Sequence, residues 1–345
     1  MKAMILKEFR QLRRDKRTVA MLVAMPLVLL IVFGYAARFD ISDIRTAVVG
    51  PAAEAVESSL QEPFDAVVVD PSAGDQEARD LLRDGRASVA IVTGSAPAIY
   101  VDGADLFTAQ SALRRGGNLP EGVQAEILFN PDLSTSAVMV PGLVGLVLLA
   151  MGTIITSLGV VRERQEGTLE QLAVLPLRSR DVIAGKIAPY ALIGVFDLVL
   201  ITVVGLAVFD VPFRGSVWVF AAGSLAFLLA VLGIGVLIST VSQTQGEAIQ
   251  LAIMVVLPQV LLSGLIFPLT SMPIGVRWVS YGLPLTYFVV IVRGVFLKAT
   301  PFGPLIVPFL ALVGLATAFF GLAMFRFRRV LTPARAARVP KEAAA

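Results

Sequence analysis

Long stretches without charged residues constrain this chain more than any other feature. A helix that rises about 1.5 Å per residue needs roughly 20 apolar residues to cross a hydrocarbon core of about 30 Å. Five stretches meet this test with no charged residue, and a sixth contains only Asp197. Because 56% of the residues are hydrophobic and only 16% are charged, much of the apolar surface must face lipid. We therefore predict an all-α polytopic membrane protein with six transmembrane helices, over residues 18–37, 137–161, 187–209, 216–241, 248–269 and 301–325.

Charges at the two ends predict the orientation of these spans. Residues 1–17 contain seven basic and two acidic residues, and the tail at 326–345 is also basic. By the positive-inside rule both ends are cytoplasmic, which requires an even number of spans. Residues 272–298 are apolar but contain Gly282 and Pro284, so we interpret them as a re-entrant half-helix pair before the sixth span. The N-terminal segment is either an amphipathic, elbow-like helix on the membrane surface or a plain basic flank.

A polar segment of about one hundred residues, 38–132, separates the first two spans. It contains 16 acidic residues and seven arginines, so we expect it to be extracytoplasmic. Short β-branched runs in it alternate with helix-like stretches. This pattern predicts an inserted α/β domain with strands near 47–49, 66–69, 89–93, 99–101 and 127–129.

The composition excludes several kinds of chemistry. There is no cysteine and no histidine, so thiolate nucleophiles, imidazole bases, disulfides and the usual zinc and haem sites are absent. The phosphate-binding pattern G-x-x-x-x-G-K-[ST] is also absent. We predict that the chain is not an enzyme, has no catalytic residue and no metal site, binds no cofactor, and has membrane lipid rather than nucleic acid as a partner.

A charged loop follows the second span and is the most specific motif in the sequence. Residues 162–186 begin R-E-R-Q-E-G-T-L-E-Q-L and continue to a proline. An acidic, capped helix with an apolar edge suits docking to a partner, although a bland membrane-flanking loop is the alternative. The candidate contact residues are Arg162, Glu163, Arg164, Glu166, Gly167, Thr168, Leu169, Glu170, Leu172 and Pro176.

This loop resembles that of ABC-2 type exporter permeases, which reads R-E-R-x-x-G-T-L-E-Q-L-x-x-x-P-L. The resemblance is to the daunorubicin-resistance or multidrug variety, which has a large extracytoplasmic first loop. It implies a permease in the plasma (inner) membrane that exports a hydrophobic or amphipathic drug, lipid or polymer. The same resemblance implies a coupling helix that docks on a separate ATPase subunit carrying ATP and Mg, and a dimer with a second copy or related chain. A second block resembles the re-entrant region of the family: Ser263, Gly264, Phe267 and Pro268, then Pro284, Thr286, Tyr287 and Arg293.

Two charged residues in apolar surroundings leave alternatives open. Asp197 is either a pathway residue or a structural one that bonds to neighbours such as Tyr190 or Thr202. Arg293 either binds an anionic head group or satisfies carbonyl groups of the half-helices. The alternative functions are an ion-driven secondary transporter with Asp197 as its ion site, and a membrane scaffold or receptor that transports nothing.

Overall fold

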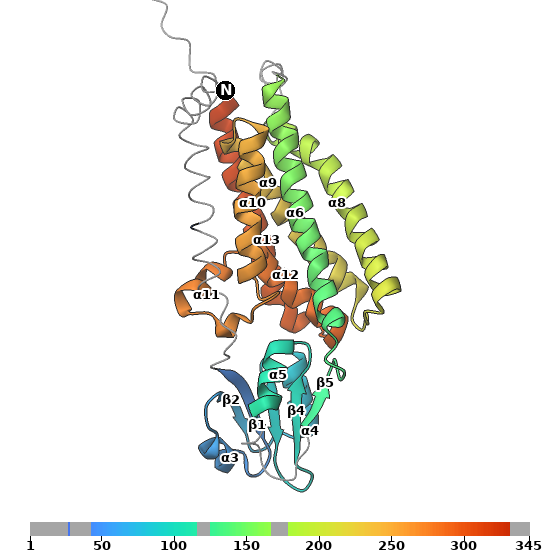
Figure 1. Ribbon diagram of the computed structural model, residues 1–345, viewed down its shortest axis with the longest axis vertical. Helices are drawn as coiled ribbons and strands as arrows, with labels where there is room; N and C mark the ends of the chain where they lie inside the picture. Colours follow the sequence, from blue (N-terminus) through green and yellow to red (C-terminus); the bar gives the residue numbers. More distant parts are fainter. Residues whose placement is uncertain (1–26, 28–42, 116–124, 167–178, 332–345) are drawn as a thin grey trace, which may run out of the picture.

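The computed structural model describes residue 27 and residues 43–115, 125–166 and 179–331. A sheet domain forms one end of the molecule and a bundle of helices extends from it (Figure 1). Apart from Leu27, the predicted first span lies outside the described residues. So do the basic N-terminal segment, most of the charged loop and the C-terminal tail.

The domain is built on one mixed sheet of five strands in the order β2-β1-β3-β4-β5. Neighbouring strands are parallel, except that β3 and β4 run antiparallel. Strand β1 lies near the middle, and five of its six residues are buried, as expected for a strand covered on both faces. The strands span Ile44–Val49 (β1), Phe64–Asp70 (β2), Val89–Val92 (β3), Ala98–Asp102 (β4) and Ala125–Leu128 (β5).

Helices cover both faces of this sheet, because alternate strand residues point to opposite sides. Helices α3, Ala53–Ser59, and α5, Leu106–Arg115, pack on the face that contains Ile44 and Val48. Helix α4, Asp75–Arg83, packs on the other face. Its C-terminal end points toward the helical bundle, and this end matters for the site below.

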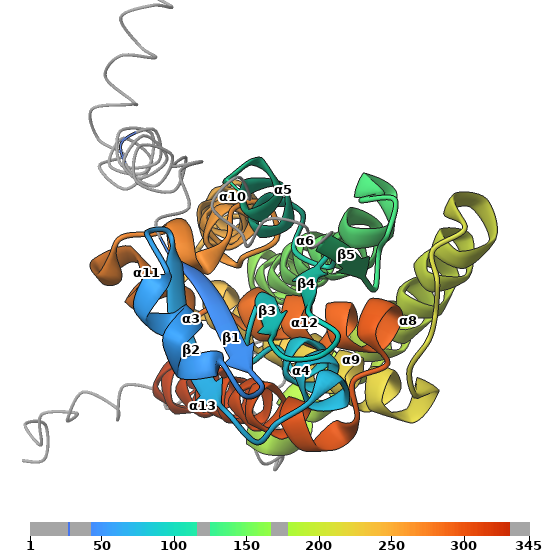
Figure 2. The same ribbon diagram turned by 90° about the horizontal axis from the view of Figure 1, so that it is seen from below.

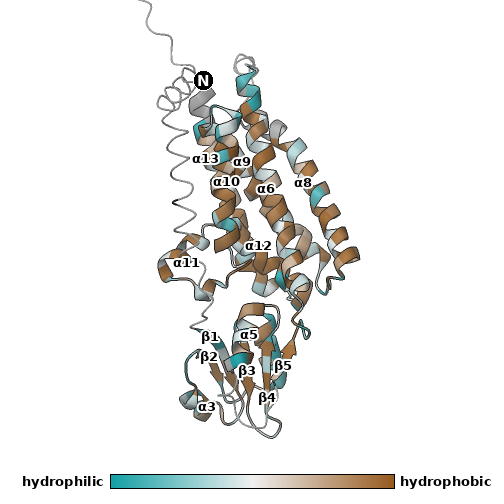
Figure 3. Ribbon diagram, in the orientation of Figure 1, coloured by the Kyte–Doolittle hydropathy of each residue, from teal (hydrophilic) through white to brown (hydrophobic). Residues whose placement is uncertain are grey.

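Five helices of the described part are long and apolar enough to cross a membrane, or six if the bent pair described below counts as one span. Figure 3 shows hydrophobic residues along most of the length of these helices, with hydrophilic residues at the far end of α6. They span Thr135–Gln165 (α6), Ser179–Phe209 (α8), Val217–Val241 (α9), Gln245–Leu262 (α10) and Phe302–Leu331 (α13).

Helix α9 is the centre of the bundle. Of its candidate span, 72% is buried, against 22% for α8 and 17% for α13. Small residues allow the close approach: a Cβ atom on Gly235 would lie 2.8 Å from the Cβ atom of Thr156 on α6. Helix α8 lies at the edge in both views (Figures 1 and 2) and leaves residues such as Leu192 and Phe196 exposed.

An unequal helix pair connects α10 to α13. A 3-10 turn η2, Leu269–Ser271, leads to α11, Ile274–Ser280, and then to α12, Pro284–Arg293, which continues as the π-helical turn η3, Gly294–Lys298. The pair is bent by 81°. Both α10 and α13 meet it at the end of the bundle near the sheet domain (Figure 1), so the segment enters and leaves on one side.

The two halves of the pair differ in burial, a difference that the prediction of two half-helices did not include. Helix α12 is buried in the bundle, where the ring of Phe288 stacks on Phe227 at 4.3 Å. Helix α11 has only seven residues and lies at the edge, with Ile274 and Trp278 exposed by 73% and 72%. A helix of about two turns is too short to bury an apolar face of its own.

Several predicted boundaries were wrong because local caps and breaks override the hydropathy pattern. Helix α10 stops at Leu262, since Gly264 at φ 83° and Pro268 break it. The loop predicted at 162–186 is shorter, because α6 continues to Gln165 and α8 begins at Ser179.

Glu247 lies in the first turn of α10. Its backbone N–H donates to the Thr244 Oγ1 atom at 3.2 Å, and its carboxylate accepts from the Gln243 N–H at 2.6 Å. These two bonds form a reciprocal N-terminal cap, which explains an acidic residue without a basic neighbour.

Candidate functional site

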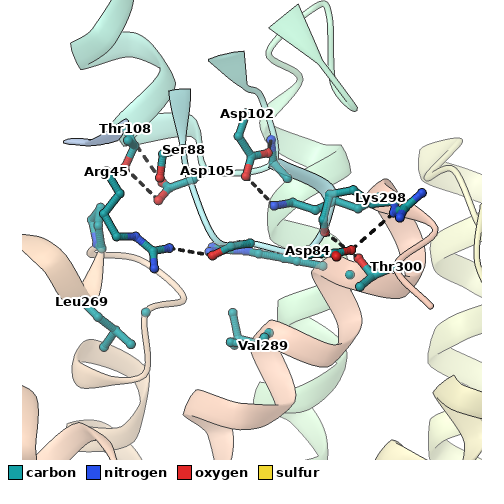
Figure 4. A pocket seen from close by; sticks show the side chains of 18 of the residues that line it. Arg45, Asp84, Ser88, Asp102, Asp105, Thr108, Leu269, Val289, Lys298 and Thr300 are labelled. Carbon is teal, nitrogen blue, oxygen red and sulfur yellow. Dashed lines mark hydrogen bonds and ion pairs between the residues drawn. The ribbon is translucent and has the colours of Figure 1, made fainter. Parts of the chain in front are cut away.

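A cavity of about 240 Å³ lies where the sheet domain meets the bundle (Figure 4). Its domain wall is polar and comes from β1, the end of α4 and the start of α5, including Arg45, Ser88 and Asp105. Its bundle wall is largely apolar and includes Leu269 and Val289. The cavity is therefore amphipathic, and segments more than two hundred residues apart in the sequence form it.

A buried lysine joins the two parts at the edge of this cavity. The Lys298 ammonium group forms an ion pair with Asp102 on β4 and donates to the Leu82 carbonyl at 3.0 Å. Two residues on, the Thr300 hydroxyl donates to the Arg83 carbonyl at 2.9 Å. The unpaired carbonyls at the C-terminal end of α4 favour a cation and hydroxyl donors there. This contact fixes the domain on the bundle.

Asp102 is an uncommon carboxylate, because its side chain is only 7% exposed. Burial raises its pKa, while the Lys298 ammonium group and the Ala104 backbone N–H, at 3.0 Å from its carboxylate, act in the opposite direction. These partners offset part of the cost of burying the charged carboxylate. Asp102 is a structural anchor of the site.

Other pKa shifts in the domain lie away from the cavity. The Tyr100 hydroxyl lowers the pKa of Asp75, with which it forms a hydrogen bond, and burial raises the pKa of Tyr100 itself. Arg79 lies 4.1 Å over the Tyr100 ring, and although burial acts to lower its pKa, its ion pairs with Glu126 and Asp75, both at 3.1 Å, raise that pKa. This cluster connects α4 to β4 of the sheet through the hydrogen bond between the Tyr100 hydroxyl and Asp75.

Arg293 lies at the cavity as a partly satisfied cation. One of its terminal nitrogens donates to the Leu265 carbonyl at 3.1 Å, which supports the predicted structural role. Its Nε atom is buried and has no hydrogen-bond partner among the residues that the structure describes. The unpaired Nε–H group of Arg293 can therefore donate a hydrogen bond to a ligand.

The structure brings four of the predicted re-entrant residues together around the cavity: Ser263, Gly264, Pro268 and Arg293. Ser263 caps α10, and its side chain accepts from the Leu265 N–H at 3.3 Å.

The other four predicted residues of this block have structural roles. Phe267 packs in an apolar cluster. Pro284 is the first residue of α12, the Thr286 hydroxyl donates to the Ser280 carbonyl at 2.7 Å, and the Tyr287 hydroxyl donates to the Tyr281 carbonyl at 2.7 Å. These bonds fix the corner between α11 and α12.

Asp197 is placed apart from this site, on the peripheral helix α8. It lines a narrow space of about 10 Å³ together with Tyr190 and Thr156. Within the described ranges it forms no hydrogen bond to Tyr190 or Thr202, and the Thr202 hydroxyl is buried without a partner there. The hydrogen bonds predicted for a structural Asp197 are therefore not found.

The opposite end of the bundle contains the start of the predicted coupling segment. Arg162, Glu163 and Arg164 belong to the last turn of α6 rather than to a separate helix. The Arg162 guanidinium pairs with Glu166 at 2.9 Å, and both side chains are exposed. The remaining candidates, Gly167, Thr168, Leu169, Glu170, Leu172 and Pro176, lie outside the described residues.

Sequence reasoning missed the domain wall of the cavity. Arg45, Asp105 and Lys298 were not among the candidates, because they lie in segments assigned to different parts of the protein. Lys298 did carry a usable signal: it is the only lysine between Lys186 and Lys341, and it ends an apolar stretch. A lysine in such a place needs a partner, although the sequence does not say which.

Comparison with known proteins decides the family. The family described as "ABC-2 family transporter protein" matches residues 16–325. This chain belongs to the ABC-2 transporter family. The permease is 30% identical over 368 residues to the probable multidrug ABC transporter permease YbhS of Escherichia coli K12, covering 96% of this chain and 97% of that protein. It is 26% identical over 330 residues to YbhR of the same strain, another probable multidrug ABC transporter permease, covering 86% and 89%.

A more distant relative comes from a eukaryote. The permease is 30% identical over 172 residues to ABC transporter G family member 20 of Dictyostelium discoideum, covering 49% of this chain and 23% of that protein. Together these matches make the chain the permease subunit of an ABC exporter, a multi-pass membrane protein. The ion-driven carrier and the scaffold considered from the sequence are not supported.

Proposed function

We propose that this permease is half of the membrane unit of an exporter, and that a second copy or a related permease chain completes it. Cytoplasmic ATPase subunits, with ATP and Mg bound to them, supply the energy. The observation that supports this proposal is the match to the ABC-2 family over residues 16–325. The chain itself acts in transport and not in catalysis, since its sequence has no P-loop.

The proposed orientation puts the sheet domain outside the cytoplasm and both termini inside, in the plasma (inner) membrane. It rests on the basic residues at both ends of the sequence. The arrangement of the helices supports it, because the sheet domain and the last turn of α13 lie at opposite ends of the bundle (Figure 1). A cytoplasmic tail after α13 then leaves the domain on the other side.

The coupling segment of the proposed mechanism is residues 162–186. ATP-driven closure of the ATPases pushes this segment, tilts α6 and opens the pathway outward. Glu163 and Glu166 are the proposed contacts for basic residues of the ATPase, and Glu166 is exposed at the end of α6.

The proposed substrate is a hydrophobic or amphipathic molecule, such as a drug, a lipid or a polymer. The support is that YbhS and YbhR are named as probable multidrug permeases. Export from the cytoplasm follows from the same relatives.

Charge reversal at the coupling segment tests this proposal. The variant Glu163→Lys with Glu166→Lys is co-purified with its ATPase subunit in nanodiscs, and the ATPase activity is measured. We expect at least a tenfold loss of coupled activity, because close charged contacts between proteins contribute about 1.5 kcal/mol or more. The matched control is Glu54→Lys with Glu57→Lys, which reverses two exposed charges at the same spacing on α3. Unchanged coupling in the first variant, or equal loss in the control, contradicts the docking site.

A further inference from the structure

We propose that the cavity between the sheet domain and the bundle binds the negatively charged head group, a phosphate or carboxylate, of an amphipathic molecule. Arg293 and Arg45 are its contacts. This inference deepens the proposed function and rests on it for the nature of the ligand, because an exporter of amphipathic molecules has to receive their polar ends on the outer side. The test below needs no ATPase, so it can fail independently.

The charges around the cavity favour an anion. Two of its acidic residues are already paired, Asp102 with Lys298 and Asp84 with Arg83 at 3.4 Å. In the described ranges, neither Arg45 nor Arg293 has a carboxylate within ion-pair distance. Two cations without ionic partners and one remaining acid therefore face the same space.

The remaining acid, Asp105, does not cancel this preference. Its carboxylate accepts from the Thr108 hydroxyl at 2.8 Å, and it lies at the start of α5 on the domain wall. A cationic ligand that reached Asp105 would have to share the cavity with both arginines. Both guanidinium groups would repel that cationic ligand in this partly buried site, which disfavours its binding.

Arg293 supplies the most direct indication of a ligand. Its Nε atom is buried without a hydrogen-bond partner among the described residues, while another nitrogen of the same group bonds to the Leu265 carbonyl. An unsatisfied buried donor on a charged group is costly. A phosphate or carboxylate oxygen satisfies it with a charge-assisted hydrogen bond, which is the strong kind. Arg45 is exposed and lines the same cavity from the domain wall, where one of its terminal nitrogens donates to the Gly85 carbonyl at 2.9 Å. Figure 4 shows its side chain at the cavity.

The size and the walls of the cavity favour a head group over a whole drug. Pockets that enclose a drug-sized ligand measure about 300–1,000 Å³, and this cavity is smaller, about 240 Å³. Its bundle wall combines Arg293 with the apolar side chains of Leu269, Val289 and Leu305, whereas its domain wall is polar. Figure 4 shows Leu269 and Val289 on the side opposite Ser88 and Asp105. A ligand with a charged head and the first carbons of a chain matches both surfaces, and the rest of its chain stays in lipid.

The test measures binding to the purified full-length permease in phosphatidylcholine nanodiscs by isothermal titration calorimetry, with empty nanodiscs subtracted. The probes are octyl phosphate, octyl glucoside and inorganic phosphate. We expect octyl phosphate to bind at least tenfold more tightly than either of the others, since it alone combines a charge with a chain. Equal binding of octyl glucoside overturns the requirement for charge, and equal binding of inorganic phosphate overturns the requirement for an amphipathic molecule.

Variants then assign the residues. Arg293→Gln and Arg45→Gln each should weaken octyl phosphate binding at least about tenfold, the effect of losing one hydrogen bond to a charged group. The control Arg86→Gln removes an exposed positive charge from the same domain, outside the cavity, and should leave binding unchanged. If Arg293→Gln does not fold, judged by its elution as a monodisperse peak, Arg45→Gln and the charge-conserving Arg293→Lys carry the test. Equal effects of Arg45→Gln and Arg86→Gln overturn the proposal.

Discussion

Replacing Lys298 by methionine should loosen the attachment of the sheet domain to the bundle. The side chains of Lys298 and Asp102 are only 11% and 7% exposed, so the change leaves a buried carboxylate without its cation. Breaking a buried pair in this way typically costs about 3–5 kcal/mol. Protonation of Asp102 limits the cost: for an ordinary carboxyl pKa of about 3.9, taking up a proton at pH 7 costs about 4 kcal/mol. We therefore expect a loss of about 3–4 kcal/mol at pH 7.

The same limit predicts a dependence on pH. Burial already raises the pKa of Asp102, and removal of Lys298 raises it further. An acid whose pKa is higher in the folded state destabilises that state at high pH, and the penalty disappears as the pH falls toward the unfolded pKa. At pH 5.5 the limit is about 2 kcal/mol. Lowering the pH should therefore restore part of the stability that Lys298→Met loses relative to the unchanged protein.

Hydrogen exchange followed by mass spectrometry measures this opening. Amides at the end of α4 and in β4 should exchange several hundredfold faster, roughly 150- to 900-fold, in Lys298→Met at pH 7, after correction for intrinsic rates. The double variant Lys298→Met with Asp102→Asn carries no buried charge and should exchange more slowly than the single variant. Unchanged exchange in Lys298→Met, or a double variant that opens more than the single one, would refute this account of the junction.

Two further changes test the elements around the site. Gly264→Ala places a Cβ atom at φ 83° and 3.3 Å from the Leu269 side chain, and should lower stability by about 1–2 kcal/mol. Its thermal unfolding in detergent is compared with that of Gly303→Ala, where no atom lies within 4 Å, and equal midpoints would contradict the strain. Thr244→Ala removes the cap of α10 at a cost of about 1 kcal/mol, so amides in its first turn should exchange roughly fivefold faster. Thr244→Ser keeps the acceptor and should behave like the unchanged protein; equal exchange in both variants would refute the cap.

The sequence predicted the elements of this fold better than their ends. Each of the five expected strands overlaps one strand of the sheet, because β-branched runs fit a buried pleated surface. The uncharged windows that fall within the described residues coincide with long helices, because a helix satisfies its own backbone hydrogen bonds where no water is present. The ends depend on single residues, such as Gly264 after α10 and the cap at Thr244, whose effects a window of hydropathy averages out.

The site was only half predictable. Ser263, Gly264, Pro268 and Arg293 were expected to lie together because they resemble the re-entrant block of ABC-2 permeases, and they line one wall of the cavity. The other wall depends on contacts such as that of Lys298 with Asp102, which are 196 positions apart. No periodicity or spacing links two such residues, so a single sequence gives no reason to pair them.

Helix α6 has a mechanical consequence for the whole molecule. Its 31 residues give it a length of about 46 Å, and residues at its start, Ala137 and Val138, share one apolar cluster with Ala104 and Leu106 of the sheet domain. A lever of that length that swings by about 10° moves its far tip by roughly 8 Å. In the proposed mechanism, a spectroscopic label on the sheet domain would therefore report movement at the end of α6 that carries Glu166.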